Sequence, residues 1–260
     1  MSEVSALEYM LRRDRAVVIG SLLSVILLSW LYLVQGAGMD MQSMGDMAVP
    51  MAMTSWSPGY FALLVVMWAV MMTAMMLPSA APMILLYATI ARRRRTQGNT
   101  VAGAGVFALG YVAVWAAFSL TATTLQWGLD AAALLSPAMA TTSVVTAGIV
   151  LVVAGVYQWT PLKQACLRQC QSPLSFILGN WCEGAHGALT MGLRHGLFCL
   201  GCCWMLMLVL FVGGVMNLFW IASLALFIMV EKTAAGSQWL SRAAGAGLIA
   251  WGGATLLSLN

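Results

Sequence analysis

Long apolar runs dominate the chain, and polar residues fall in short groups between them. An apolar stretch of about 17 or more residues is long enough to cross a bilayer core of roughly 30 Å as a helix. Seven segments meet or approach this length, and the sixth is the shortest. They cover residues 16–34, 60–77 with a continuation to 90, 101–126, 142–159, 197–215, 218–230 and 243–257. The pattern predicts an all-α fold, a polytopic transmembrane helical bundle with about seven spans.

Composition supports one membrane domain over the whole of residues 1–260. Only 8% of the residues are charged and 62% are hydrophobic, whereas about a quarter of the residues of a soluble domain are charged. The formal net charge is +4, but the basic residues stand beside apolar spans, where they set orientation. We therefore expect the lipid bilayer as a partner and no nucleic acid.

The basic groups are distributed unevenly between the loops. Arg12, Arg13 and Arg15 precede the first span, four arginines at 92–95 follow the second, and Lys163 and Arg168 follow the fourth. The positive-inside rule then predicts a cytoplasmic N-terminal segment 1–15, an outer loop at 35–60 and a cytoplasmic connection at 160–196. No small-residue cleavage site precedes the first span, which reads as a retained anchor in a bacterial inner membrane.

Two local features modify this topology. Pro78 and Pro82 fall at the end of the second span, where proline removes a backbone donor and bends a helix. The segments 197–215 and 218–230 are closely spaced, so a re-entrant hairpin is the alternative to two complete spans. The adjacent Glu231 and Lys232 that end the second of these segments are expected to be an interface pair with Glu231 turned inward, and a functional ionisable group within the membrane is the alternative.

The outer loop 35–60 is rich in methionine. Thioether sulfur is a soft ligand suited to Cu(I), and unlike a thiol it is not lost to disulfides in an oxidising compartment. A flexible loop that only touches lipid headgroups is the alternative. The methionines are Met39, Met41, Met44, Met47, Met51 and Met53, alongside Asp40 and Asp46.

The second span carries two methionine rows. Met67, Met71 and Met75 are spaced four apart, and Met72 and Met76 form a parallel row. Residues four apart lie on one helix face, so the rows would line one side of the span as a path for a soft cation. Methionine is also a common filler of packed helices, which is the alternative.

The fifth span holds the densest group of soft donors, in GLRHGLFCLGCCWMLM. At about 100° per residue, His195, Cys199 and Cys202 fall within roughly 60° of one another, with Cys203 at the edge of that sector. Met205 follows. This donor set suits Cu(I), or zinc if His195 is included. A buried cysteine can also be a simple small hydrophobe.

The connection 160–196 adds Cys166 and Cys170, which a short helix would present on one face. The basic residues nearby favour thiolate. Simple packing beneath the membrane surface is the alternative for this pair.

Five segments carry a resemblance to a known family: MMTAMMLPSAAPM, GVYQWTPLKQACLRQC, CLGCCWMLM, VGGVMN and EK at 231–232. Together they resemble a bacterial family of unknown function whose members are described as predicted metal-binding integral membrane proteins. The resemblance covers residues 58–235. It implies a membrane metal-binding protein and no particular reaction.

These patterns predict a membrane protein that binds a soft metal, Cu(I) ahead of zinc, for uptake, transfer or delivery to a cuproenzyme. The predicted ligands are His195, Cys199, Cys202, Cys203, Met205, Cys166, Cys170, Met71, Met72, Met75 and Met76. A metal acceptor on either side, or a larger membrane complex, is the expected partner. The alternatives are a membrane thiol oxidoreductase and a structural subunit or assembly factor. A non-enzymatic role is favoured, and the absence of a P-loop disfavours energy-driven export.

Overall fold

The computed structural model describes residues 2–36, 41–44, 47–50, 56–136, 139–234, 236 and 238–258, with side chains described from residue 16 to 36 and from 56 onward. Helices account for most of this part of the chain, which confirms the predicted helical class. The helices are α1 Ser2–Val34, α2 Pro58–Thr96, α3 Ala104–Ala131, α4 Val144–Tyr157, α5 Pro161–Gln171, α6 Pro173–Asn180, α7 Gly184–Leu208, α8 Leu210–Gly213, α9 Leu218–Thr233 and α10 Gln238–Leu257.

A short antiparallel hairpin lies within the loop predicted at 35–60. Its strands are β1 Met41–Met44 and β2 Met47–Pro50, with Met41 opposite Pro50 and Met44 opposite Met47. Regular structure was not predicted for this loop. The methionine side chains for which we expected a metal-binding role lie outside the described side chains.

Each of the seven predicted segments coincides with a helix, but fewer helices meet the requirements of a membrane span. In the described part of the chain, four are long and apolar enough to cross a membrane: Ala16–Val34 of α1, α2, α3, and Gly184–Gly213 formed by α7 and α8. The pair α4 and α5, bent by 64°, would supply a fifth. These helices indicate membrane association. Seven spans and a cytoplasmic N-terminus stay predictions.

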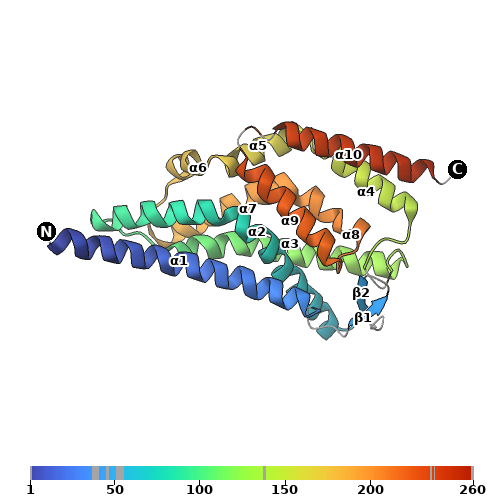
Figure 1. Ribbon diagram of the computed structural model, residues 1–260, viewed down its shortest axis with the longest axis horizontal. Helices are drawn as coiled ribbons and strands as arrows, with labels where there is room; N and C mark the ends of the chain where they lie inside the picture. Colours follow the sequence, from blue (N-terminus) through green and yellow to red (C-terminus); the bar gives the residue numbers. More distant parts are fainter. Residues whose placement is uncertain are drawn as a thin grey trace.

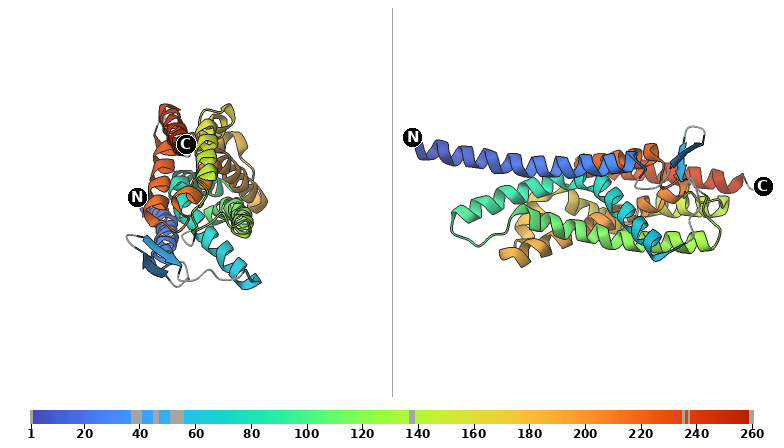
Figure 2. Two further views of the ribbon diagram at one scale, coloured as in Figure 1. Left: turned by 90° about the vertical axis from the view of Figure 1, so that its right-hand side faces the viewer. Right: turned by 90° about the horizontal axis from the view of Figure 1, so that it is seen from below.

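The helices form an elongated bundle around α2 and α7 (Figures 1 and 2). Helix α3 packs against both α2 and α7, α1 and α9 pack on α2, and α4 packs along α10. The N-terminus of α1 and the arginine-rich end of α2 lie at one end of the bundle, and the hairpin lies at the other (Figure 1). Because α2 and α7 are the most buried of the long helices, side chains between them are removed from the surroundings.

Helix α2 begins at a strong cap and changes direction along its length. Ser57 accepts a hydrogen bond from the backbone N–H of Tyr60, and Pro58 occupies the first turn, where its missing donor costs nothing. Pro78 and Pro82 lie inside the helix, which Figures 1 and 2 show to be bent, as the sequence predicts. At this bend two hydroxyls, of Ser79 and Tyr111, donate to the backbone carbonyl of Met76, at 2.8 and 3.1 Å.

Helices α3 and α7 approach each other through glycine. A Cβ atom added at Gly192 would lie 2.0 Å from the carbonyl oxygen of Phe107, and one added at Gly110 would lie 2.4 Å from that of Leu189. Small residues at such contacts allow two backbones to approach closely, the usual solution for helices packed within a membrane. This contact fixes α7 relative to α3, and so fixes the position of the cysteines that α7 carries.

We expect Gly192→Ala to lower the thermal stability of the protein in detergent, because backbone atoms of Phe107 cannot yield to the added methyl group. The loss should be on the order of 1–3 kcal/mol, the usual range for overpacking. The control is Gly128→Ala on α3, where a Cβ meets nothing within 4 Å. Circular dichroism melting curves measure both variants, and equal melting temperatures would contradict the close contact.

Candidate metal centre

Helix α7 carries three buried cysteines at its middle. Cys199, Cys202 and Cys203 are each no more than 1% exposed. The helix begins at Gly184, well before the predicted start of the span at residue 197, so residues 184–196 belong to α7 and not to the connection. His195 and the cysteines therefore lie on one continuous helix.

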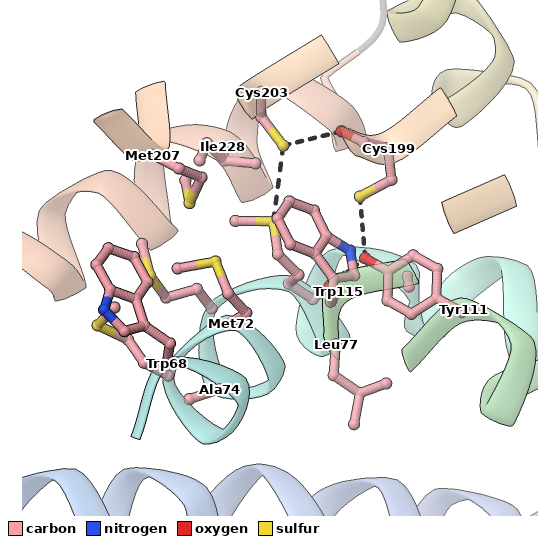
Figure 3. Close-up of a cluster of buried hydrophobic side chains, with 14 of the residues drawn as sticks. Trp68, Met72, Ala74, Leu77, Tyr111, Trp115, Cys199, Cys203, Met207 and Ile228 are labelled. Atoms are coloured by element: carbon pink, nitrogen blue, oxygen red, sulfur yellow. Dashed lines mark hydrogen bonds between the residues drawn. The ribbon is translucent and has the colours of Figure 1, made fainter. Parts of the chain in front are cut away.

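Cys199 and Cys203 face α2, where they meet a thioether (Figure 3). The sulfur of Cys203 lies 3.9 Å from the sulfur of Met76, and the Cys203 thiol also donates to the backbone carbonyl of Cys199 at 2.9 Å. Metal–sulfur bonds of about 2.3 Å separate two ligands of a trigonal ion by about 4.0 Å. The observed sulfur–sulfur distance matches this separation. Three soft donors from two helices are thus gathered in a dry part of the bundle.

The predicted methionine rows lie in the bundle core beside this group. Met71, Met72, Met75 and Met76 are all buried, as is Met67. Figure 3 shows thioether side chains of α2 following one another toward the cysteines of α7. The rows therefore lead from one half of α2 to the sulfur group at its bend.

A second pair of thiols joins α7 to α5. Cys170 of α5 lies near Cys202 of α7, where the two thiols interact electrostatically. Cys166 packs against Gly201, where an added Cβ would lie 2.7 Å from its sulfur. Both cysteines of α5 thus face α7, as their four-residue spacing predicts. Thr160 caps α5 by accepting from the backbone N–H of Lys163, with Pro161 in the first turn.

His195 and Met205 are surrounded mainly by apolar and aromatic side chains. His195 is buried among the rings of Phe107, Tyr111 and Phe176, with ring centroids 5.4–6.1 Å away, and its Nδ1 has no hydrogen-bond partner among the described residues. Met205 packs toward α4, against a separate cluster of Leu151, Ala154 and Val209.

Among the described residues, no three side chains of the types His, Cys, Asp and Glu are grouped as a metal site requires. The donor that lies beside Cys203 is the thioether of Met76, with 3.9 Å between the two sulfurs. The assignment of His195, Cys199 and Cys202 to one set of ligands stays a prediction.

Three polar groups that were not predicted as part of the site surround Cys199. The Lys232 ammonium lies 2.8 Å from the sulfur of Cys199, 3.9 Å from that of Met76 and 3.3 Å from the hydroxyl of Ser79. The hydroxyl of Tyr111 lies 3.0 Å from the Cys199 sulfur. The rarity of ionisable residues in apolar spans was a signal for Lys232. Nothing in the sequence pattern distinguishes Tyr111 or Ser79.

Glu231 and Lys232 do not form the expected interface pair. Both are buried, and each is bound elsewhere. The Glu231 carboxylate accepts from the Lys163 ammonium at 2.5 Å and from the Ser241 hydroxyl at 2.5 Å, and Lys163 also donates to the side chain of Gln158. Lys163, which the sequence predicts in the cytoplasmic connection, is fully buried. An ion pair of this kind balances two charges that neither lipid nor apolar core would accept alone.

One family comparison matches most of this structure. The family PpoB2, described as "Copper chaperone", matches residues 65–255. The matched region includes the methionine rows, all six cysteines and the two buried lysines, and leaves out α1 and the hairpin. Comparison with curated proteins and comparison with solved structures gave no match. This match supports the predicted resemblance to a metal-related family and indicates that the metal is copper. Membership of the family of unknown function named above stays a prediction.

We expect Glu231→Gln to destabilise the protein by about 3 kcal/mol or more, because the Lys163 ammonium would stay buried without a counter-charge. The double variant Lys163→Met/Glu231→Leu should recover much of this loss, since it removes both charges. Thermal unfolding in detergent compares them with the control Glu183→Gln, which breaks an exposed contact with Arg94 at 3.8 Å and should cost at most about 1 kcal/mol. A Glu231→Gln protein as stable as wild type would refute the stabilising role of the buried ion pair between Lys163 and Glu231.

Proposed function

The chain belongs to the PpoB2 copper-chaperone family, and from that premise we propose that it binds Cu(I) inside its helical bundle and delivers the ion to a copper-using partner. The observation that carries the proposal is the sulfur group formed by Cys199, Cys203 and Met76, with its 3.9 Å spacing between the last two sulfurs. Cu(I) is the cargo in this scheme. The protein acts by binding and releasing it, without a chemical reaction.

The donor set favours Cu(I) over zinc. Structural zinc sites use four thiolate, imidazole or carboxylate ligands in a tetrahedron, and the described residues do not offer even three such groups together. Thiolate combined with thioether is a soft set with a low coordination number, which suits Cu(I). The buried position of all three sulfurs also removes the water that a harder cation would retain.

The order of the donors supports a route through the protein. The methionine rows of α2, including Met71, Met72 and Met75, would receive Cu(I) and lead it to the centre at Met76, Cys199 and Cys203. Cys202 and Cys170 form the next thiol pair, and Cys166 lies beyond them beside Gly201. Thiolate holds Cu(I) more tightly than thioether, so affinity increases along this route. His195 and Met205, both predicted ligands, are not needed for it.

The predicted membrane topology gives the proposed transfer a direction. With the N-terminus in the cytoplasm of a bacterium and the protein in its inner membrane, the methionine-rich loop faces outward and α5 lies on the cytoplasmic side. Copper would then be captured outside and offered inside, to a cytoplasmic acceptor or a cuproenzyme under assembly. The hairpin and the arginine-rich end of α2 lie at opposite ends of the bundle, in agreement with this arrangement (Figure 1).

The proposal predicts that purified protein retains Cu(I) after anaerobic loading and gel filtration, and that Cys199→Ser/Cys203→Ser abolishes retention. Met76→Leu should reduce the number of sulfur neighbours of copper in X-ray absorption spectra by one, since it removes a thioether and leaves both thiols. The matched controls are Cys182→Ser, an exposed cysteine, and Met229→Leu on α9, which is outside the sulfur group. Equal copper in wild type and the double serine variant would exclude this centre.

The same variants separate this role from thiol oxidoreduction. A redox function of the cysteines should survive Met76→Leu, because the thioether takes no part in thiol–disulfide exchange. Copper transfer should not survive it, because Met76 links the methionine rows to the thiols.

A further inference from the structure

Lys232 is a buried cation without a carboxylate partner. Its side chain is 5% exposed, and of the ion pairs between described side chains neither involves it. The neighbouring carboxylate of Glu231 is turned away toward Lys163 and Ser241. Burying an ammonium is costly unless nearby groups compensate its charge. The compensating groups here are the Cys199 sulfur at 2.8 Å, the Ser79 hydroxyl and the Met76 sulfur.

The ammonium touches two of the three sulfurs that would bind copper. It lies 2.8 Å from Cys199 and 3.9 Å from Met76, while a metal ion would approach a sulfur to about 2.3 Å. A monovalent metal ion and an ammonium cannot both occupy this space, and as like charges they repel each other strongly in an apolar interior. Occupation by one therefore opposes occupation by the other.

Ser79 offers the ammonium a second position. Its hydroxyl lies 3.3 Å from the Lys232 nitrogen and donates to the carbonyl of Met76 at the bend of α2. Lysine has a long flexible side chain with three donors on a compact charge. A small movement of the side chain would exchange the Cys199 contact for closer contact with Ser79.

We propose that Lys232 is a resident cation that occupies the sulfur centre when copper is absent and withdraws toward Ser79 when Cu(I) binds. This inference rests on the proposed function. Lys232 thereby limits the affinity for Cu(I), and its return to Cys199 assists release to the next acceptor. A chaperone needs such a limit, because a buried centre with two thiols and a thioether would otherwise hold its cargo too long to deliver it.

Lys232→Gln tests this directly. We expect it to bind Cu(I) about tenfold more tightly than wild type, because the competing charge is gone, and to release Cu(I) correspondingly more slowly. Lys232→Arg, which keeps the charge, should stay near wild type. Competition with a chromophoric Cu(I) chelator at one fixed pH gives the affinity, and stopped-flow transfer to the chelator gives the rate. Arg242→Gln on α10, an exposed position, controls for the loss of one positive charge.

Ser79→Ala supplies a second test that does not alter the lysine. Without the alternative hydroxyl contact, the ammonium should stay longer at Cys199, so Cu(I) should bind more weakly than in wild type. Unchanged or weaker binding by a folded Lys232→Gln protein would overturn the inference, as would Ser79→Ala binding equal to wild type. If wild type itself retains no Cu(I), or retains it independently of Cys199 and Cys203, the proposed function fails as well. Cysteine-dependent binding that is indifferent to Lys232 overturns only the inference.

Discussion

The strongest constraint on the structure is the burial of two adjacent charges on α9. Both charges must be compensated inside an apolar bundle. Successive residues on a helix point about 100° apart, so Glu231 and Lys232 face different neighbours. Glu231 is bound to α5 through Lys163 and to α10 through Ser241, and Lys232 is bound to α7 through Cys199 and to α2 through Ser79. Since neither charge can be left uncompensated in an apolar interior, α9 is fixed in rotation and height between the two halves of the bundle. The geometry of the sulfur centre depends on that fixed position of α9.

Rigid packing on the other side of α7 completes this geometry. The glycine contact between α3 and α7 leaves no space for sliding, and Tyr111 of α3 reaches both the Met76 carbonyl at the bend of α2 and the Cys199 sulfur. Side chains held by several neighbours need little rearrangement when a ligand binds. The bend at Pro78 thus has a structural role, because it presents a backbone carbonyl to the hydroxyls that surround the centre.

Much of the fold followed from the sequence, because hydrophobic segments report helices directly. All seven predicted segments coincide with helices, and Pro78 and Pro82 predicted the bend in α2. The site was predicted less completely. Spacing on one helix grouped Cys199, Cys202 and Cys203 with His195 and Met205, but it says nothing of which neighbouring helix each side chain meets. Their role as metal ligands stays a prediction. Glu231 and Lys232 were expected at the membrane interface because charge alone suggests exposure, whereas the pairing of Glu231 with Lys163 and of Lys232 with Cys199 depends on tertiary contacts.

Burial of the three cysteines of α7 also bears on their chemical lifetime. Thiols are oxidised to sulfenic acid, or exchanged with disulfides, only where an oxidant or a second sulfur compound can reach them, and Cys199, Cys202 and Cys203 are enclosed by helices. Their reduced state then depends on access and not on which compartment the nearest loop faces. The orientation of the chain in the membrane and the survival of its thiols become separate questions, and a bundle of this kind could carry reduced sulfur through an oxidising environment.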